Sequence, residues 1–339
     1  MRLIRSFVAI CIASLLQLEP EQKPDRSPLS VSPRLYTISL MKKALLTSFC
    51  ILSAFVSAEI RGQPFEVQLD GDSGVLKVLK AGVRFPVVVQ NAKKGMRPYL
   101  HPVRTPDGNG VITEIHPDHH LHQTGIYWGL KKVNDRDFFM NYSGDYYRHQ
   151  SLRIIKKTGD TVAWETVYDL IDERGDGILR ETQTWSLSAE DGFLLLDLEW
   201  QGKGLTEVKV EKFFVGGLFL RMPWSKGIAG AAINSAGQKN SDEADGRRAD
   251  WVDVGMAISG IEDWGHIAIL DHPANVASST PWRVDTQLGV GPSRQILGDW
   301  SLGKDETTVE RYRLVVYAGD LDRKKIAELW KSYSSESRN

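Results

Sequence analysis

Cysteine is almost absent from this 339-residue sequence. Its two cysteines, Cys11 and Cys50, both precede residue 59. From Glu59 onward the chain therefore has no thiol to serve as a nucleophile or metal ligand, and it cannot form a disulfide. A domain of this length buries enough apolar surface to be stable without disulfides. Thiol catalysis is thus excluded for this part of the chain.

Long hydrophobic runs are absent as well. The apolar run from Ala44 to Val56 is shorter than the roughly 20 residues that a membrane-spanning helix needs. It follows a short basic segment and ends in Val56-Ser57-Ala58, which is the pattern of a secretory signal peptide. We therefore expect a signal peptide at residues 41–58, a periplasmic or extracellular protein, and no membrane span after it. We expect translation to start at Met41, so that residues 1–40 come from a start site assigned too far upstream. The alternative is that residues 1–40 are a genuine N-terminal extension.

An excess of basic residues is also lacking. Residues 59–339 contain 35 basic and 40 acidic side chains, a net charge of −5, with no basic run. Such a chain does not attract a phosphate backbone, so a nucleic-acid partner is excluded. The sequence also lacks a P-loop, an H-E-x-x-H motif and a G-x-S-x-G motif.

What the sequence does contain is a series of short alternating segments. Between Gly192 and Trp200, the leucines at 194, 196 and 198 fall on one face, and Asp197 and Glu199 fall on the other. This alternation predicts a strand with one buried face. Further strands are expected at Phe65–Leu69, Gly74–Lys80, Val83–Val89, Thr161–Tyr168, Leu179–Leu187, Glu207–Phe214, Gly217–Met222, His266–Asp271 and Thr307–Val316.

Helix is scarce, and one helix is expected near the C-terminus. Asp320 or Asp322 can cap it, and its apolar stripe consists of Ile326, Leu329, Trp330 and Tyr333. No repeat of 20–50 residues is present. The sequence therefore predicts an all-β fold, a large β-sandwich with few helices, as a single domain at residues 59–339. A long loop is expected at residues 227–250, and Gly216-Gly217 indicates a bulge or a close backbone approach.

Five of the eight histidines lie between residues 97 and 129. If His120-Leu121-His122 is extended, both imidazoles point to one face and Leu121 points into the core. Imidazole exchanges protons near neutral pH, so the pair could catalyse proton transfer on a sugar. Alternatively, His116, His120 and His122 are metal ligands. A third possibility is that these histidines only hydrogen-bond loops around a polar groove.

Other segments contribute candidate site residues. Proline-rich Arg97–Gly108 predicts a rigid extended segment ending in a Pro-Asp-Gly turn, which would hold His101 in place. Asp271-His272 ends a predicted strand and is a candidate catalytic pair. Arginines beside aromatic residues are typical of a sugar-binding wall. The candidate substrate-binding residues are Arg97, Arg104, Trp128, Arg221, Arg247 and Trp282.

Several of these motifs occur together in one known family. The ordered set RPYLHPVRTPDG, PDHHLHQTGIYWG, VNDRDFF, DHPANVASSTPWRV and VVYAGD resembles the bacterial family labelled "methane oxygenase PmoA" (DUF6807). The resemblance covers nearly all of residues 59–339. A membrane methane monooxygenase subunit needs several apolar spans of about 20 residues. Since this part of the chain has none, methane oxygenation is not the activity we expect.

The segment Asp118–His122, followed by Gly125, is also similar to the first catalytic-histidine motif of aldose epimerases. This weaker resemblance implies a galactose mutarotase-like supersandwich with a sugar groove. It makes His120 or His122 the proton donor to the ring oxygen. It also implies a second histidine, His149 or His272, and a carboxylate base, for which Asp271 and Glu310 are the candidates.

Together these features predict a protein that acts on, or binds, a small sugar or a glycan. The expected chemistry is histidine-mediated acid/base catalysis of epimerisation, isomerisation or elimination, without a cofactor. One alternative is a non-catalytic glycan-binding protein of the cell envelope. The other is an enzyme that uses a metal bound by the histidine cluster.

Overall fold

Most of the structure consists of two large antiparallel sheets. The computed structural model describes residues 64–140 and 145–336. The first sheet has nine strands. Their order across the sheet is β16 (Trp282–Val284), β17 (Val290–Pro292), β12 (Gly217–Leu220), β5 (Ile126–Gly129), β4 (Tyr99–Val103), β3 (Val88–Asn91), β2 (Val75–Lys80), β1 (Phe65–Asp70) and β7 (Thr158–Gly159).

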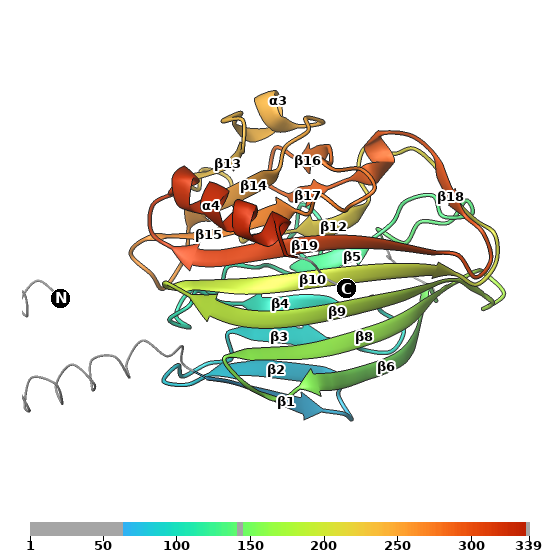
Figure 1. Cartoon of the computed structure of the whole chain (residues 1–339), viewed down its shortest axis with the longest axis horizontal. Helices are drawn as coiled ribbons and strands as arrows, with labels where there is room; N and C mark the ends of the chain where they lie inside the picture. The colour runs from blue at the N-terminus through green and yellow to red at the C-terminus, as the bar shows by residue number, and fades with distance from the viewer. Residues whose placement is uncertain (1–63, 141–144, 337–339) are drawn as a thin grey trace, which may run out of the picture. The chain divides into compact units, whose positions relative to one another are not determined.

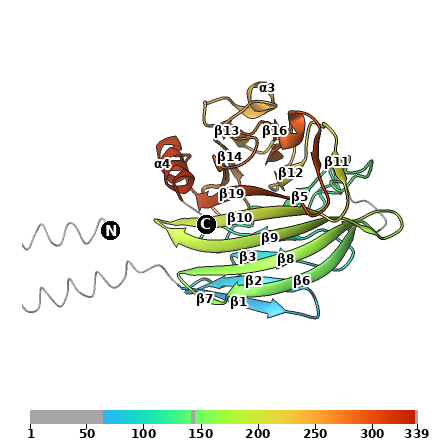
Figure 2. The ribbon, with the colours of Figure 1, turned by 45° about the vertical axis from the view of Figure 1, so that its right-hand side comes forward.

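The second sheet has eight strands, and it lies in front of β1–β4 in Figures 1 and 2. Their order is β13 (Gly230–Asn234), β14 (Trp251–Ala257), β15 (Trp264–Asp271), β19 (Thr307–Ala318), β10 (Phe193–Gly204), β9 (Gly177–Glu190), β8 (Thr161–Ile171) and β6 (Tyr147–Lys156). A small third sheet pairs β11 (Val208–Val210) with β18 (Trp300–Leu302).

The main core lies between the two large sheets. Buried side chains from both sheets, such as Leu76 of β2 and Leu196 of β10, belong to one apolar cluster. A hydrogen bond from Trp164 Nε1 to Gln90 Oε1, 3.1 Å long, also joins the sheets. This packing confirms the predicted all-β sandwich, since apolar faces of two sheets bury each other.

The sequence pattern identified ten of the nineteen strands in the described part of the chain, whereas β4–β7, β13, β14 and β16–β18 were not predicted as strands. In β10, Leu194 and Leu196 face the main core as predicted, whereas Asp197 on the other face pairs with Arg313. The expected strand at Val83–Val89 is instead β3, which begins at Val88. The strand expected at Glu207–Phe214 ends at Val210 because the chain leaves the small sheet there.

The predicted C-terminal helix is α4 (Arg323–Ser334). Asp322 is its N-cap, and the Asp322 carboxylate accepts hydrogen bonds from the backbone N–H groups of Lys324 and Lys325 at 3.0 Å. Ile326 and Leu329 of this helix pack with Leu195 on the outer face of β10. The helix therefore has a packing role.

The long loop expected at residues 227–250 is not structureless. It contains β13, which extends the eight-stranded sheet beside β14, and the short helix α3 (Asn240–Ala244). The sequence of β13, GAAIN, has few β-branched or aromatic residues, so the pattern did not indicate a strand.

Residues 64–140 and 145–336 belong to one compact unit. The expected signal peptide at residues 41–58 and the extension at 1–40 lie outside the described residues. No helix in the described part of the chain is long and apolar enough to cross a membrane.

Candidate functional site

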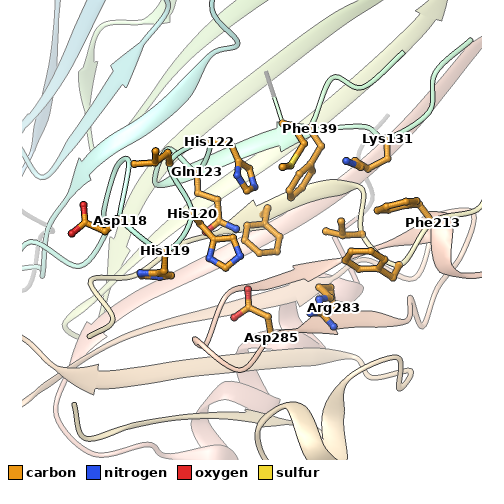
Figure 3. A pocket seen from close by; sticks show the side chains of 15 residues that line it. Asp118, His119, His120, His122, Gln123, Lys131, Phe139, Phe213, Arg283 and Asp285 are labelled. Atoms are coloured by element: carbon orange, nitrogen blue, oxygen red, sulfur yellow. The ribbon is translucent and has the colours of Figure 1, made fainter. Parts of the chain in front are cut away.

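A pocket of about 410 Å³ lies against the outer face of the nine-stranded sheet (Figure 3). Along β12, Leu218 and Leu220 belong to the main core, so Phe219 between them faces away from it. Phe219 and Phe139 belong to a separate aromatic cluster at this face. The pocket is lined by Asp118, His119, His120, Leu121, His122, Gln123, Lys131, Phe139, Met140, Phe213, Phe214, Val215, Phe219, Arg283 and Asp285.

The histidine segment enters the pocket as two tight turns. The backbone N–H of His120 donates to the Pro117 carbonyl at 2.7 Å, and that of Gln123 donates to the His120 carbonyl at 3.0 Å. The predicted extended conformation is therefore wrong. Leu121, which was expected in the core, is 58% exposed at the pocket instead. Proline and aspartate in the segment favour the turns over a strand.

The turns still bring three imidazoles together. The ring centroids of His119 and His120 are 5.2 Å apart, and those of His120 and His122 are 5.6 Å apart. The prediction that His120 and His122 lie side by side is thus correct, although an i, i+2 strand geometry is not the cause. His119 was counted in the cluster but was not among the predicted site residues.

The pKa values of all three imidazoles are lowered, which disfavours their cationic forms. Burial, followed by the positive charge of Arg221, lowers the pKa of His119 and of His120. Burial and the nearby Arg97 lower the pKa of His122 to about 3. At neutral pH the pocket therefore presents neutral imidazoles, which can accept protons.

Asp285 is the carboxylate that faces this cluster. It follows β16, and its Oδ1 accepts hydrogen bonds from the backbone N–H groups of Gln287 at 2.9 Å and Gly289 at 2.7 Å. Its Oδ2 accepts a hydrogen bond from Arg221 Nη2 at 2.7 Å. Asp285 was not among the predicted site residues. The available signal was an aspartate opening the polar turn Asp285–Gly289, where such side chains hydrogen-bond their own backbone.

The buried Arg221 hydrogen-bonds residues from two segments that line the pocket. Arg221 was predicted to bind the substrate. Its side chain is 0% exposed, however, so it cannot contact a ligand in the pocket directly. Besides Asp285, its guanidinium donates to Gln123 Oε1 and, at 2.6 Å, to the Gln287 carbonyl. Arg221 therefore ties the histidine segment to the turn that carries Asp285.

Arg97 has a similar supporting role. It is 1% exposed, and its guanidinium donates to the backbone carbonyls of His122 and Phe139. Its Cζ lies 3.8 Å from the centroid of the Tyr127 ring. Arg97 thus lies beneath the pocket, where it orients two lining segments. It was predicted to bind the substrate, but the structure gives it this supporting position instead.

The wall opposite the histidines is aromatic and carries two cations. The ring centroids of Phe213 and Phe214 lie 4.4 Å apart. Lys131 Nζ is 4.9 Å from the Phe213 centroid, and Arg283 Cζ is 5.2 Å from the Phe214 centroid. None of these four was among the predicted site residues.

The two tryptophans predicted to stack on a sugar belong to the core. Trp128 is buried and stacks on Trp200 with 4.2 Å between ring centroids. Trp282 is 0% exposed and donates from Nε1 to the Ala249 carbonyl at 2.9 Å. The aromatic residues that line the pocket are phenylalanines instead.

The remaining candidates lie away from the pocket lining. His101 Nδ1 hydrogen-bonds Thr113 Oγ1 at 3.0 Å, and Arg104 donates to the Gly108 carbonyl at 3.5 Å. Asp271 is buried and accepts hydrogen bonds from Asn275 Nδ2 and Thr280 N. His272 packs edge-on against Tyr333 of α4, and Arg247 is an exposed residue beyond α3. The structure therefore does not unite these residues with His120 and His122.

The other residues suggested by the two resemblances also lie elsewhere. His149 is on β6 and Glu310 is on β19, both in the eight-stranded sheet. His116 is exposed, and its Nδ1 hydrogen-bonds the Leu121 carbonyl at 2.6 Å. Within residues 64–140 and 145–336, no three His, Cys, Asp or Glu side chains form a group that could hold a metal ion. The alternative ligand set of His116, His120 and His122 is therefore not preformed.

One known protein family matches most of this chain. A family model described as "Family of unknown function (DUF6807)" matches residues 77–331. The chain belongs to this family. The family predicted from the ordered motifs is thus confirmed, while the description carries no methane-oxygenase label.

Other comparisons find similarity only at low sequence identity and low TM-score. No curated protein matches this DUF6807 chain. Among solved structures, it is similar to the galactosidase domain of the α-galactosidase–sucrose kinase AgaSK (8% identity, 75% of this chain, 42% of that chain, TM-score 0.37). It is also similar to an α-galactosidase from Lactobacillus brevis (9%, 81%, 43%, 0.33) and to a galactose mutarotase related enzyme from Lactobacillus acidophilus (9%, 76%, 100%, 0.27). The chain spans less than half the length of the two galactosidase structures.

The buried histidines of this DUF6807 chain predict acid sensitivity. Burial holds the pKa of His122 at about 3, below its ordinary 6.5, so the unfolded chain binds more protons between these values. The stability that His122 contributes is complete above about pH 6.5 and is lost as the pH falls. The buried Glu181 and Glu310, whose pKa values burial raises to about 7, act in the opposite direction.

A comparison with His122→Asn isolates the histidine. We expect the difference in free energy of unfolding, wild type minus variant, to shrink as the pH is lowered from 7 to 4.5. Urea unfolding at several pH values measures this difference, and the glutamates cancel because both proteins contain them. A difference that does not change with pH would contradict the prediction.

Proposed function

We propose that this pocket binds a sugar and that His120 transfers a proton during its conversion. The observation that carries the proposal is the composition of the pocket. Neutral imidazoles and the fixed carboxylate of Asp285 face a wall of phenylalanine rings. A volume of about 410 Å³ suits a small-molecule ligand. A sugar has apolar C–H faces for the rings and hydroxyl groups for the polar side.

The geometry supports different roles for the polar groups. His120 Nδ1 is buried and, within the described part of the chain, has no hydrogen-bond partner. Because Nδ1 is closed to solvent, the proton from the sugar would be accepted at Nε2 of this neutral, half-buried imidazole. Asp285, held by Arg221 and two backbone N–H groups, accepts hydrogen bonds from sugar hydroxyls and orients the ring. His119, next to His120, is placed to pass the proton on.

This chemistry corresponds to sugar epimerisation, isomerisation or elimination, each of which needs a base that takes up a proton and an acid that returns one. The protein would act in the periplasm or outside the cell, as the expected signal peptide at residues 41–58 implies.

The test is a screen of monosaccharides and their acids by NMR in D₂O, which detects both exchange of sugar protons and conversion. We expect one class of sugar to react, and His120→Asn to slow the reaction at least about 100-fold, the lower range for a lost general base. His149→Asn, on the other sheet, is the matched control and should react like the wild type. If His120→Asn turns over a sugar as fast as the wild type, the proposed role of His120 is wrong.

The same screen separates catalysis from binding alone. A sugar that binds the wild type and His120→Asn equally, with no conversion by either, would make the chain a non-catalytic glycan-binding protein.

A further inference from the structure

The two cations that line the pocket lie on one wall. Because burial and Arg221 keep the imidazoles neutral, the cations among the lining residues are Lys131 and Arg283. They lie over Phe213 and Phe214, whose adjacent rings are tilted by 30° relative to each other. Figure 3 shows both cations on the side of the pocket away from His119. Figure 3 shows Asp118 on the side of His119, and in this view Asp285 lies between His120 and Arg283.

Each cation has one acidic partner that does not line the pocket. Lys131 pairs with Asp137, and Arg283 Nη1 pairs with Asp245 Oδ2 at 2.7 Å. The Arg283 and Asp245 side chains are 26% and 36% exposed, and ion pairs at such positions contribute little to stability. A ligand anion can therefore share Arg283 at small cost, and the arginine fork can engage two ligand oxygens. The Lys131 side chain is only 12% exposed, and it adds a second positive charge at the same wall.

The structure also holds Lys131 in place. The side-chain amide of the buried Gln295 accepts a hydrogen bond from the Lys131 N–H at 3.0 Å and donates to the Lys131 carbonyl at 2.8 Å. Gly216 permits this, because a Cβ there would lie 1.7 Å from Gln295 Oε1. The close approach expected at Gly216-Gly217 thus serves to anchor a pocket cation.

We propose that the sugar bound here is anionic, and that Lys131 and Arg283 bind its carboxylate or sulfate group. This inference rests on the proposed function and specifies its substrate class. The sugar ring would lie against Phe213 and Phe214, and its hydroxyls would face Asp285 and His120. In the reverse orientation the anion would face Asp118, which lies on the His119 side of the pocket away from Lys131 and Arg283, so repulsion disfavours it.

The test compares matched pairs of acidic and neutral sugars. The pairs are glucuronate with glucose, galacturonate with galactose, mannuronate with mannose, and galactose 6-sulfate with galactose, each titrated into the full-length protein by calorimetry. We expect the acidic member of at least one pair to bind at least 10-fold more tightly, with the preference reduced by added salt. The uronate and sulfate arms identify which anion is recognised.

Two variants assign the preference to the wall. Lys131→Gln and Arg283→Gln should each lower the affinity for the acidic sugar at least fivefold and leave that for its neutral partner within twofold. Lys132→Gln is the matched control, because Lys132 is the exposed neighbour that pairs with Glu211 outside the pocket.

The outcomes distinguish this inference from the proposed function. Equal binding of both members of every pair, abolished by His120→Asn, would overturn the anionic substrate but retain the sugar site. An acidic preference that survives both glutamine variants would also overturn it. The absence of binding to every sugar, acidic or neutral, would overturn both proposals.

Discussion

Replacing Arg221 by methionine is expected to lower the free energy of unfolding by about 3–5 kcal/mol, the usual result of removing one partner of a buried ion pair. The Arg221 side chain is 0% exposed, and Asp285 beside it is nearly as buried. The substitution leaves the Asp285 carboxylate in the interior without its counter-charge. It also leaves the Gln123 side chain and the Gln287 carbonyl without their donor. Urea unfolding at pH 7 measures the loss.

Arg283→Met is the matched control for this experiment. Arg283 is also an arginine paired with an aspartate at 2.7 Å, but its side chain and that of Asp245 are partly exposed. We expect a loss of about 0–1 kcal/mol, as for other surface pairs. The double variant Arg221→Met/Asp285→Asn should recover part of the stability, because the uncompensated charge is gone. If Arg221→Met cost no more than Arg283→Met, the assigned role of Arg221 would be wrong.

Trp282→Ala is expected to cost about 3–5 kcal/mol, the range for removing a fully buried aromatic side chain. Trp282 is part of the main core and is 0% exposed. Its removal leaves a cavity, and the Ala249 carbonyl loses the indole N–H. Thermal and urea unfolding report the change.

The control for Trp282 is an aromatic residue at the pocket. Phe214 is 58% exposed, so Phe214→Ala should cost less than about 1 kcal/mol of stability. It should nevertheless weaken sugar binding, since Phe214 forms part of the wall. Trp282→Phe, which keeps most of the core volume, should bind the sugar normally. Loss of binding in Trp282→Phe without loss of folding would restore the original interpretation of Trp282 as a stacking residue.

The strands that were predicted have a local signal. Alternation between Gly192 and Trp200 identifies β10 and its buried face without knowledge of any partner strand. The capping aspartate and apolar stripe of α4 are also contained within a few turns of sequence. β13 was missed because its neighbours in the sheet, rather than its own residues, stabilise it as a strand.

The candidate site was only partly predictable. The density of histidines indicated a segment that lines the pocket, and His120 and His122 are among the lining residues. The role of Leu121 was wrong because an alternating pattern was assumed where two turns form. Arginine and tryptophan residues were judged by their side-chain chemistry, but Arg97, Arg221 and Trp282 proved to be buried supports.

From its residues alone, this chain could be assigned an all-β sandwich, a capped C-terminal helix and a histidine-rich segment, because each depends on neighbours within about ten residues. The tertiary structure was needed to bring Asp285, Lys131 and the Phe213–Phe214 wall to that segment. These residues come from connections that are far apart in the sequence. Their approach depends on β5, β12 and β16–β17 lying next to one another in the nine-stranded sheet, and on Arg221 and Gln295 bridging the connections. Long-range strand pairing and buried hydrogen bonds of this kind leave no periodic trace in a single sequence.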